Sequence, residues 1–316
     1  MTNEPLVPPL NPSEVIAQVA WALPEQARSH VIICGSLAAA YNFFSGDGAA
    51  SLRTKDVDIL FSPHAVAVDA AVEVTEQLMA ANWTQREDGT FGTGGRPEDN
   101  LDDLPVVRLR PPAGEGAPAP WFLELLAAPP QYAAGGNEKT NQRVHTSAGD
   151  FMIPSFAYLA LAECKPIMTQ QGVLIARPEM MALANMLHHP VIRTDVMRDT
   201  PGWKRSNKDL GRVLAMAYLT IERDRREETD EFGDWADRMW EALREKFGDD
   251  AGRLAIGAGS GINALLASRD DLAQALTIAN LGLLASLDVS MAAFEATGRR
   301  FQAELLERLD ELVVGR

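Results

Sequence analysis

The spacing of apolar side chains predicts an opening helix, strand, turn and helix. Residues 13–27 place apolar side chains at helical spacing, after a capping candidate, Asn11, and a proline suited to a first turn. Residues 30–34 (HVIIC) form a short β-branched run that ends at Gly35 and Ser36. The pattern LAAAYNFF that follows is helical again. We therefore expect a tight turn between a buried strand and a helix at Gly35.

A second strand is predicted at residues 54–61 (TKDVDILF), where polar and apolar side chains alternate. Successive side chains of a strand point to opposite faces, so Asp56 and Asp58 share one face while Val57 and Ile59 share the other. A helical pattern follows at residues 65–81. The second strand is thus expected to carry two carboxylates side by side.

Further strands are predicted from Trp83 onward and at residues 106–110 and 121–127, separated by glycine- and proline-rich stretches. We expect the polar loop at residues 87–103 to be mobile. After residue 154 the pattern is almost wholly helical, and GAGSG at residues 257–261 is predicted to link two helices. The fold class expected is α+β: a small mixed β-sheet followed by a mostly α-helical part, with a boundary near residue 150.

Composition indicates in which cellular compartment the protein is expected. The chain has 316 residues, with 46% hydrophobic and 23% charged side chains. No apolar run approaches the roughly 18 residues of a membrane span, and the N-terminal stretch has prolines and acids where a secretory signal is basic and apolar. Cys34 and Cys164 are too few and too far apart for a zinc site or a disulfide framework. We expect a cytoplasmic protein with no membrane partner.

A net charge of −15 opposes non-specific binding to phosphate backbones, so a nucleic-acid partner would need a local basic patch. One candidate lies at residues 193–212, where six basic residues outnumber three aspartates. The basic residues are Arg193, Arg198, Lys204, Arg205, Lys208 and Arg212. A solvated helix face explains the same composition equally well.

The candidate chemistry centres on acids in strands. Asp56 and Asp58 lie roughly 7 Å apart along one strand face and could converge on Mg²⁺, which prefers oxygen ligands. Glu124 is a third candidate, because an unpaired charge within the apolar strand FLELLA would be costly. Arg108 and Arg110, on a neighbouring strand, could balance either phosphate or the acids themselves. Each feature alone has an ordinary explanation, such as surface alternation or chain reversal.

Taken in order, CGSLAAAYNFF, LRTKDVDILF and FLELLA resemble the polymerase-beta-type nucleotidyltransferase superfamily. Its signature is a Gly-Ser or Gly-Gly turn, a D-x-D strand and a third acid on a later strand. Within it, LRTKDVDIL and RSNKDLGRVLAMA are similar to the branch of abortive-infection toxins and related uncharacterised bacterial nucleotidyltransferases. In PEMMALANMLHH, Asn185 stands where many of these relatives have lysine.

The resemblance implies a nucleotidyltransferase-like α/β domain at residues 31–150, preceded by a helix within residues 1–30 and followed by a helical domain at residues 151–316. It implies that Asp56, Asp58 and Glu124 bind Mg²⁺ or Mn²⁺ and carry catalysis, with Glu124 helping to activate the attacking hydroxyl. The implied contacts with a nucleoside triphosphate come from Gly35, Ser36, Arg53 and Lys208.

The implied reaction moves a nucleoside monophosphate from a triphosphate such as ATP to a hydroxyl and releases pyrophosphate. RNA or tRNA is the first expectation for the acceptor because toxin-like relatives use such acceptors, and a protein or a small molecule comes next. A partner protein, as in toxin–antitoxin pairs, is a further expectation. The alternative is a non-catalytic module that retains the fold and binds a nucleotide or a partner.

Overall fold

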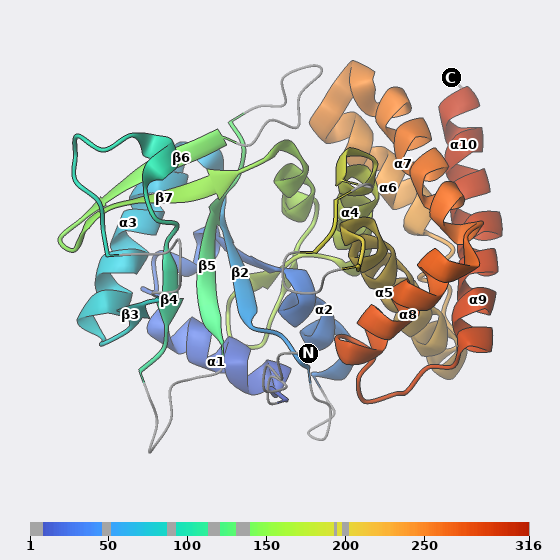
Figure 1. Cartoon of the computed structure of the whole chain (residues 1–316), viewed down its shortest axis with the longest axis horizontal. Helices are drawn as coiled ribbons and strands as arrows, with labels where there is room; N and C mark the ends of the chain where they lie inside the picture. Colours follow the sequence, from blue (N-terminus) through green and yellow to red (C-terminus); the bar gives the residue numbers. More distant parts are fainter. Residues whose placement is uncertain are drawn as a thin grey trace. The chain divides into compact units, whose positions relative to one another are not determined.

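The computed structural model describes residues 9–45, 52–86, 93–112, 121–130, 140–192, 195–197 and 202–315. The chain divides into two compact units, Met1–Ala176 and Arg177–Arg316. The first unit contains all the described strands, and the second is helical (Figure 1). The predicted α+β class, with a mixed sheet followed by a mostly helical part, is therefore confirmed.

The first unit is built around a seven-stranded mixed sheet in the order β3-β4-β5-β2-β1-β9-β8 (Figure 1). Strand β2 lies near its middle, antiparallel to β1 and parallel to β5. The strands of this sheet are β1 (Val31–Cys34), β2 (Asp56–Phe61), β3 (Thr84–Gln85), β4 (Arg108–Arg110), β5 (Phe122–Ala127), β8 (Ile167–Met168) and β9 (Leu174–Ile175).

The helices of the first unit begin where the sequence predicts. In α1 (Pro12–Ala22), the Asn11 side chain accepts hydrogen bonds from the backbone N–H groups of Ser13 and Glu14. Helix α2 (Gly35–Phe44) starts directly after β1 and packs on β1 and β2, and α3 (His64–Ala80) packs on β2 and β5. Short 3₁₀ helices lie at Arg28–His30, Leu101–Asp103 and Ala157–Glu163.

One side of the central strands forms the core. Val57 and Ile59 of β2 and Leu123 and Leu125 of β5 have no solvent exposure. On the opposite face, the positions of Asp56, Asp58 and Glu124 are partly exposed, whereas Leu60, Phe122 and Leu126 are buried.

A two-stranded hairpin, β6 (Thr140–Thr146) and β7 (Gly149–Ser155), was not predicted. Arg143 of β6 forms an ion pair of 2.6 Å with Asp150 of β7 and donates to the carbonyl oxygens of Arg96, Pro97 and Asp99. This guanidinium joins residues 96–99, within the loop expected to be mobile, to the hairpin. Residues 87–92 of the predicted loop lie outside the described part of the chain.

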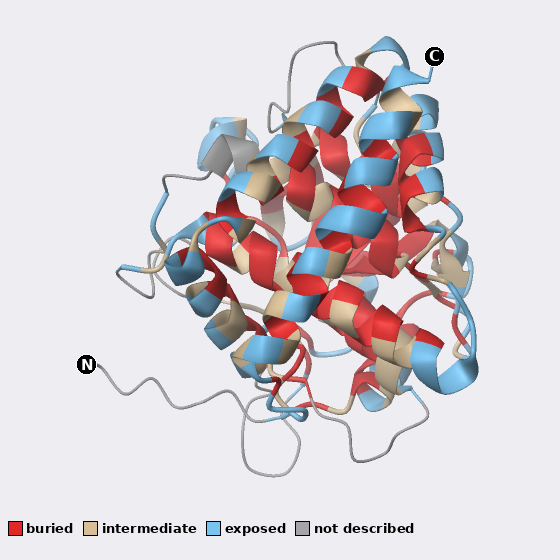
Figure 2. Ribbon diagram, turned by 90° about the vertical axis from the view of Figure 1, so that its right-hand side faces the viewer, coloured by how far each residue is buried: buried red, intermediate tan, exposed pale blue. Residues whose placement is uncertain are grey.

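The second unit consists of helices with buried stripes on one side and exposed positions on the other (Figure 2). They are α4 (Pro178–Ile192), α5 (Arg205–Glu227), α6 (Trp235–Phe247), α7 (Ala251–Leu266), α8 (Arg269–Leu281), α9 (Met291–Arg300) and α10 (Glu307–Val314), with a 3₁₀ turn at Gly248–Asp250 and a π-helical segment at Phe301–Leu306.

One expectation for the region after residue 154 is wrong, and two short strands accompany its helices. The sequence GAGSG lies inside α7 rather than between helices, because Ala258 and Gly259 face the buried side of a continuous helix. The strands β8 and β9 also follow residue 154; they pair with each other, and β9 pairs with β1. Among the described residues, no helix has the length and hydropathy needed to cross a membrane.

Candidate active site

The three predicted acids lie on one face of the sheet. Asp56 and Asp58 are two residues apart on β2, and Glu124 of β5 is the register partner of Asp58. Neighbouring residues in register on parallel strands point to the same face, so Glu124 projects beside Asp58. All three are partly exposed, whereas the flanking Val57 and Leu123 have no solvent exposure.

Asp56 is oriented by a neighbouring hydroxyl. The buried side chain of Thr54 donates to Asp56 Oδ1 at 2.8 Å and lies 3.1 Å from the carbonyl oxygen of the same residue. A hydrogen bond to a charged acceptor is stronger than a neutral one, so it holds the carboxylate in one rotamer. The sequence pattern gave no sign of this role for the threonine before the D-x-D pair.

Asp58 lies against the first turn of α2. A Cβ atom built on Gly35 would be 2.5 Å from Oδ2 of Asp58, and the φ angle of Gly35 is +71°. Only glycine adopts this conformation without strain, and only glycine leaves room for the carboxylate. The predicted tight turn at Gly35 is therefore confirmed, together with its closeness to the second aspartate.

Cys34 is the register partner of Asp58 on β1 and is free and buried. Burial, together with the negative charge of Asp58, raises the pKa of the Cys34 thiol far above its ordinary value. The thiol therefore stays protonated at neutral pH and is no nucleophile.

Glu124 is compensated by an arginine from the adjoining strand. Arg108 of β4 is the register partner of Glu124, and its Nε lies 2.7 Å from Glu124 Oε2. The two side chains are 20% and 18% exposed, so the pair is largely shielded from water. The charge of Glu124 inside an apolar strand, which metal binding was expected to explain, is balanced here by Arg108.

Aromatic contacts hold the arginines at this edge of the site. The guanidinium carbon of Arg86 lies 4.2 Å from the ring centroid of Phe122, and that of Arg108 lies 5.5 Å from it. Phe122 is buried and is the register partner of Asp56. Arginine–aromatic stacking of this kind persists beside water and fixes the guanidinium planes. The sheet face thus carries a basic edge next to its acids.

The remaining predicted contacts are spread over both units. Ser36 occupies the second position of α2, and Arg53 precedes Thr54; both are partly exposed. Lys208 lies on α5, which belongs to the second unit, whereas the sheet belongs to the first. The predicted site residues of the first unit are thus gathered at β2, β5 and the start of α2.

Two further residues, from the segments RSNKDLGRVLAMA and PEMMALANMLHH, lie in the second unit. Asp209 is buried, with its Oδ2 3.4 Å from Nδ1 of His188 on α4. Asn185 donates from its amide to the backbone oxygen of Met181 in the same helix, at 2.6 Å. The Asn185 side chain is therefore hydrogen-bonded within its own helix.

Within the described ranges, no three histidine, cysteine, aspartate or glutamate side chains are gathered as they would be around one metal ion. Glu124 leans to Arg108, and Asp56 accepts from Thr54. The donors that share the face are nevertheless hard carboxylate oxygens, the ligand type that Mg²⁺ and Mn²⁺ take.

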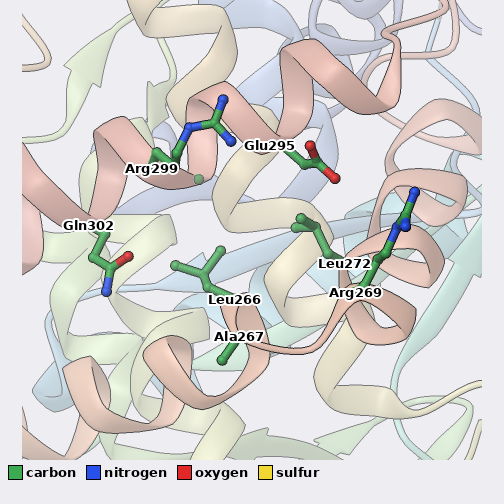
Figure 3. A pocket seen from close by; sticks show the side chains of 8 residues that line it. Leu266, Ala267, Arg269, Leu272, Glu295, Arg299 and Gln302 are labelled. Carbon is green, nitrogen blue, oxygen red and sulfur yellow. The ribbon is translucent and has the colours of Figure 1, made fainter.

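A cavity of about 250 Å³ lies elsewhere, within the second unit. Arg269 of α8 and Arg299 of α9 flank it, and Glu295 lies between them in the view of Figure 3. The other lining residues are Leu266, Ala267, Leu272, Gly298 and Gln302. This cavity contains none of the predicted site residues.

Comparisons with known proteins add one distant likeness. No family model and no curated protein matches the chain. A solved structure of an antigenic nucleotidyltransferase-like protein from Paracoccidioides brasiliensis is 13% identical, with a TM-score of 0.38 over 86% of this chain and 95% of that chain. A TM-score of this size does not establish a common fold.

Proposed function

We propose that the chain is a metal-dependent nucleotidyltransferase, which moves a nucleoside monophosphate from a nucleoside triphosphate to a hydroxyl. The observation that carries the proposal is the position of Asp58, between the glycine turn that opens α2 and the third acid, Glu124. The first unit, Met1–Ala176, would carry the nucleotidyltransferase-like domain that the sequence places at residues 31–150, and the helical second unit would follow it.

The donors of the site fit a hard divalent cation. Asp56 and Asp58 project from one face of a strand, both are partly exposed, and Thr54 keeps one carboxylate oriented. These residues would hold Mg²⁺ or Mn²⁺, with Glu124 as the third acid. A bound divalent ion supplies charge compensation for the triphosphate and for the developing pyrophosphate.

Phosphate oxygens would be received at the start of α2. The Cys34 cap position makes no side-chain hydrogen bond to the first turn, and backbone N–H groups at a helix start attract anions. The Gly35 backbone and the Ser36 hydroxyl would contact the triphosphate, and the Arg53 cation would balance its charge.

The reaction forms one bond and breaks another. The acceptor oxygen attacks the α-phosphorus, the bond from that phosphorus to the bridging α–β oxygen breaks, and pyrophosphate leaves with the bonding electron pair. The acceptor proton passes to a base. Glu124 takes this role in the proposal because its carboxylate stands beside Asp58 in register, at the same level of the sheet.

RNA, with a tRNA end as the first candidate, is the acceptor we favour, and a toxin-like role would follow from it. Arg205, Lys208 and Arg212 share one face of α5 at helical spacing, which suits a phosphate backbone. Lys204 forms an ion pair with Asp271, with 2.7 Å between Nζ and Oδ1. Arg193 and Arg198 lie outside the described residues. A protein or small-molecule hydroxyl is the next candidate, favoured by the net charge of −15.

Two contacts favour a second candidate function, a non-catalytic module that binds a nucleotide or a partner protein. Arg108 already compensates Glu124, and Asn185 bonds to its own helix where many relatives of the proposed family have lysine. Such a module would bind a triphosphate without consuming it.

Pyrophosphate release separates the two candidates. The protein is incubated with Mg²⁺, each of the four triphosphates, and total cellular RNA or protein, with label on the α-phosphate. We expect pyrophosphate and one labelled class of acceptor, both lost in Asp56→Ala combined with Asp58→Ala. Asp69→Ala, an exposed acid on α3, is the matched control that keeps activity. A folded wild type that binds a triphosphate but releases no pyrophosphate would leave only the binding module.

A further inference from the structure

Glu124 and the two aspartates share one face of the sheet. Thr54 donates to Asp56, and the Gly35 turn borders Asp58. Glu124 contacts a full positive charge, with 2.7 Å between Arg108 Nε and its Oε2. The carboxylate of the third acid is therefore already engaged by a guanidinium.

Several contacts set the position of Arg108. Its backbone nitrogen donates to the Gln85 side chain at 3.2 Å, and its backbone oxygen accepts from Arg86 at 2.7 Å. Its guanidinium lies over the buried Phe122 ring, which it shares with that of Arg86. Arg108 is therefore built into the sheet edge, and its head group is presented toward the acids.

Removing Arg108 from Glu124 would leave a largely shielded carboxylate without compensation, which is costly. A guanidinium also binds phosphate oxygens, and a triphosphate offers it more negative charge than one carboxylate does. An anion that draws Arg108 away would free Glu124 to join Asp56 and Asp58. The exchange needs only a side-chain movement at the edge of the site.

We propose that Arg108 is a positioning residue that withholds Glu124 from the metal until a polyphosphate takes over its guanidinium. The inference rests on the proposed function, since it requires a divalent ion at Asp56 and Asp58. Its consequence is that Glu124 contributes to metal binding only when the polyphosphate is present. Triphosphate binding would in this way complete the acid triad.

Equilibrium dialysis with Mn²⁺ tests the proposal without any turnover. Without polyphosphate, Glu124→Gln should change Mn²⁺ affinity less than about twofold, whereas Asp58→Asn should weaken it on the order of tenfold or more, as loss of a charged ligand does. Arg108→Gln should tighten Mn²⁺ binding several-fold, and adding Glu124→Gln to it should reverse that gain. Arg96→Gln removes the same charge from an exposed side chain and is the matched control, with little effect expected.

The dialysis is repeated with inorganic tripolyphosphate as the second arm of the experiment. Tripolyphosphate also binds Mn²⁺ in solution, and the protein-free compartment corrects for this amount. With tripolyphosphate present, Glu124→Gln should weaken Mn²⁺ binding to the otherwise wild-type protein on the order of tenfold. If Glu124→Gln already weakens binding as much as Asp58→Asn in the absence of tripolyphosphate, the inference is wrong while the proposed metal site stands. If folded wild type binds no Mn²⁺ in either arm, the proposed function itself fails and the inference with it. Thermal unfolding of each variant checks that it is folded.

Discussion

Gly35 and Asp58 occupy adjoining space: a Cβ atom on the glycine would lie 2.5 Å from Oδ2 of the aspartate. The main-chain conformation of the turn and the position of the acid are therefore set together. This relation links the Gly-Ser turn to the D-x-D strand, two features that are separated in the sequence by about twenty residues.

Gly35→Ala should lower both stability and activity. The positive φ angle costs an alanine about 1–2 kcal/mol, and the new methyl group must also displace the Asp58 carboxylate. Gly172→Ala is the matched control, because its φ is +77° with nothing within 4 Å of the added Cβ. Urea unfolding should register both variants, whereas pyrophosphate release should fall only for Gly35→Ala. Equal activity in the two variants would show that the Asp58 contact is irrelevant to function.

Thr54→Val should reduce pyrophosphate release while leaving the fold intact. Valine keeps the shape of threonine but cannot donate to Asp56, and a hydrogen bond to a charged group contributes about 1.5–3 kcal/mol. Thr54→Ser retains the donor and should recover most of the activity. Comparing initial rates of pyrophosphate release with thermal midpoints will separate a loss of Asp56 orientation from a general loss of stability. If Thr54→Val is as active as Thr54→Ser, the role assigned to the threonine hydroxyl is wrong.

Two glycine substitutions in the helical unit should act in opposite directions. A Cβ on Gly211 of α5 would lie 2.7 Å from the backbone oxygen of Ala275 on α8, so Gly211→Ala should destabilise by about 1–3 kcal/mol through overpacking. Gly257 has nothing within 4 Å of its added Cβ and lies inside α7, so Gly257→Ala should stabilise by about 0.5–1 kcal/mol. Urea denaturation checks both, and destabilisation by Gly257→Ala would argue against the continuous α7 helix.

Asp150 should make stability depend on pH. Burial favours its neutral form, but hydrogen bonds from Arg143 and His145 and their charges outweigh burial and lower the pKa of Asp150. A lowered folded-state pKa stabilises the fold above the unfolded-state pKa, near 4, and this contribution is lost as the pH falls through the folded-state value. The thermal midpoint of Asp150→Asn should therefore lie below that of wild type at neutral pH, and the gap should close in acid.

The gap is measured from about pH 7 down to about pH 3. Asp69→Asn, on the exposed side of α3, is the control and should track wild type throughout. A difference between Asp150→Asn and wild type that stays constant over this range would mean that the carboxylate charge is not what stabilises the hairpin.

Alternation and helical periodicity were sufficient to predict the strands and helices from Asn11 to Ala127, because each buries one side against a core. The hairpin β6–β7 escaped prediction because β6 (TNQRVHT) has mostly polar side chains, so no apolar alternation marks it. Strands β8 and β9 have only two residues each, too short to show a period. Within α7, the glycines of GAGSG suggested a break, yet packing of the flanking apolar residues maintains the helix.

The candidate site was predictable to a similar degree. Sequence order indicated that Asp56, Asp58 and Gly35 belong together, and their placement at β2 and the start of α2 agrees. The pairing of Arg108 with Glu124 depends on strand register, which single-strand patterns do not encode. The roles of Asp56, Asp58 and Glu124 in binding and catalysis stay predictions. The same holds for the roles of Ser36, Arg53 and Lys208.

The central position of β2 has a consequence for amide hydrogen exchange. Strands β1 and β5 flank β2 on both sides from Asp58 to Phe61, so the backbone N–H groups of this stretch exchange only when the sheet itself opens. Asp58 therefore belongs to a segment that should be among the slowest to take up deuterium, while Arg108, on the three-residue strand β4, should exchange sooner. Deuterium uptake would thus distinguish the backbone that carries Asp58 from the edge strand that carries Arg108.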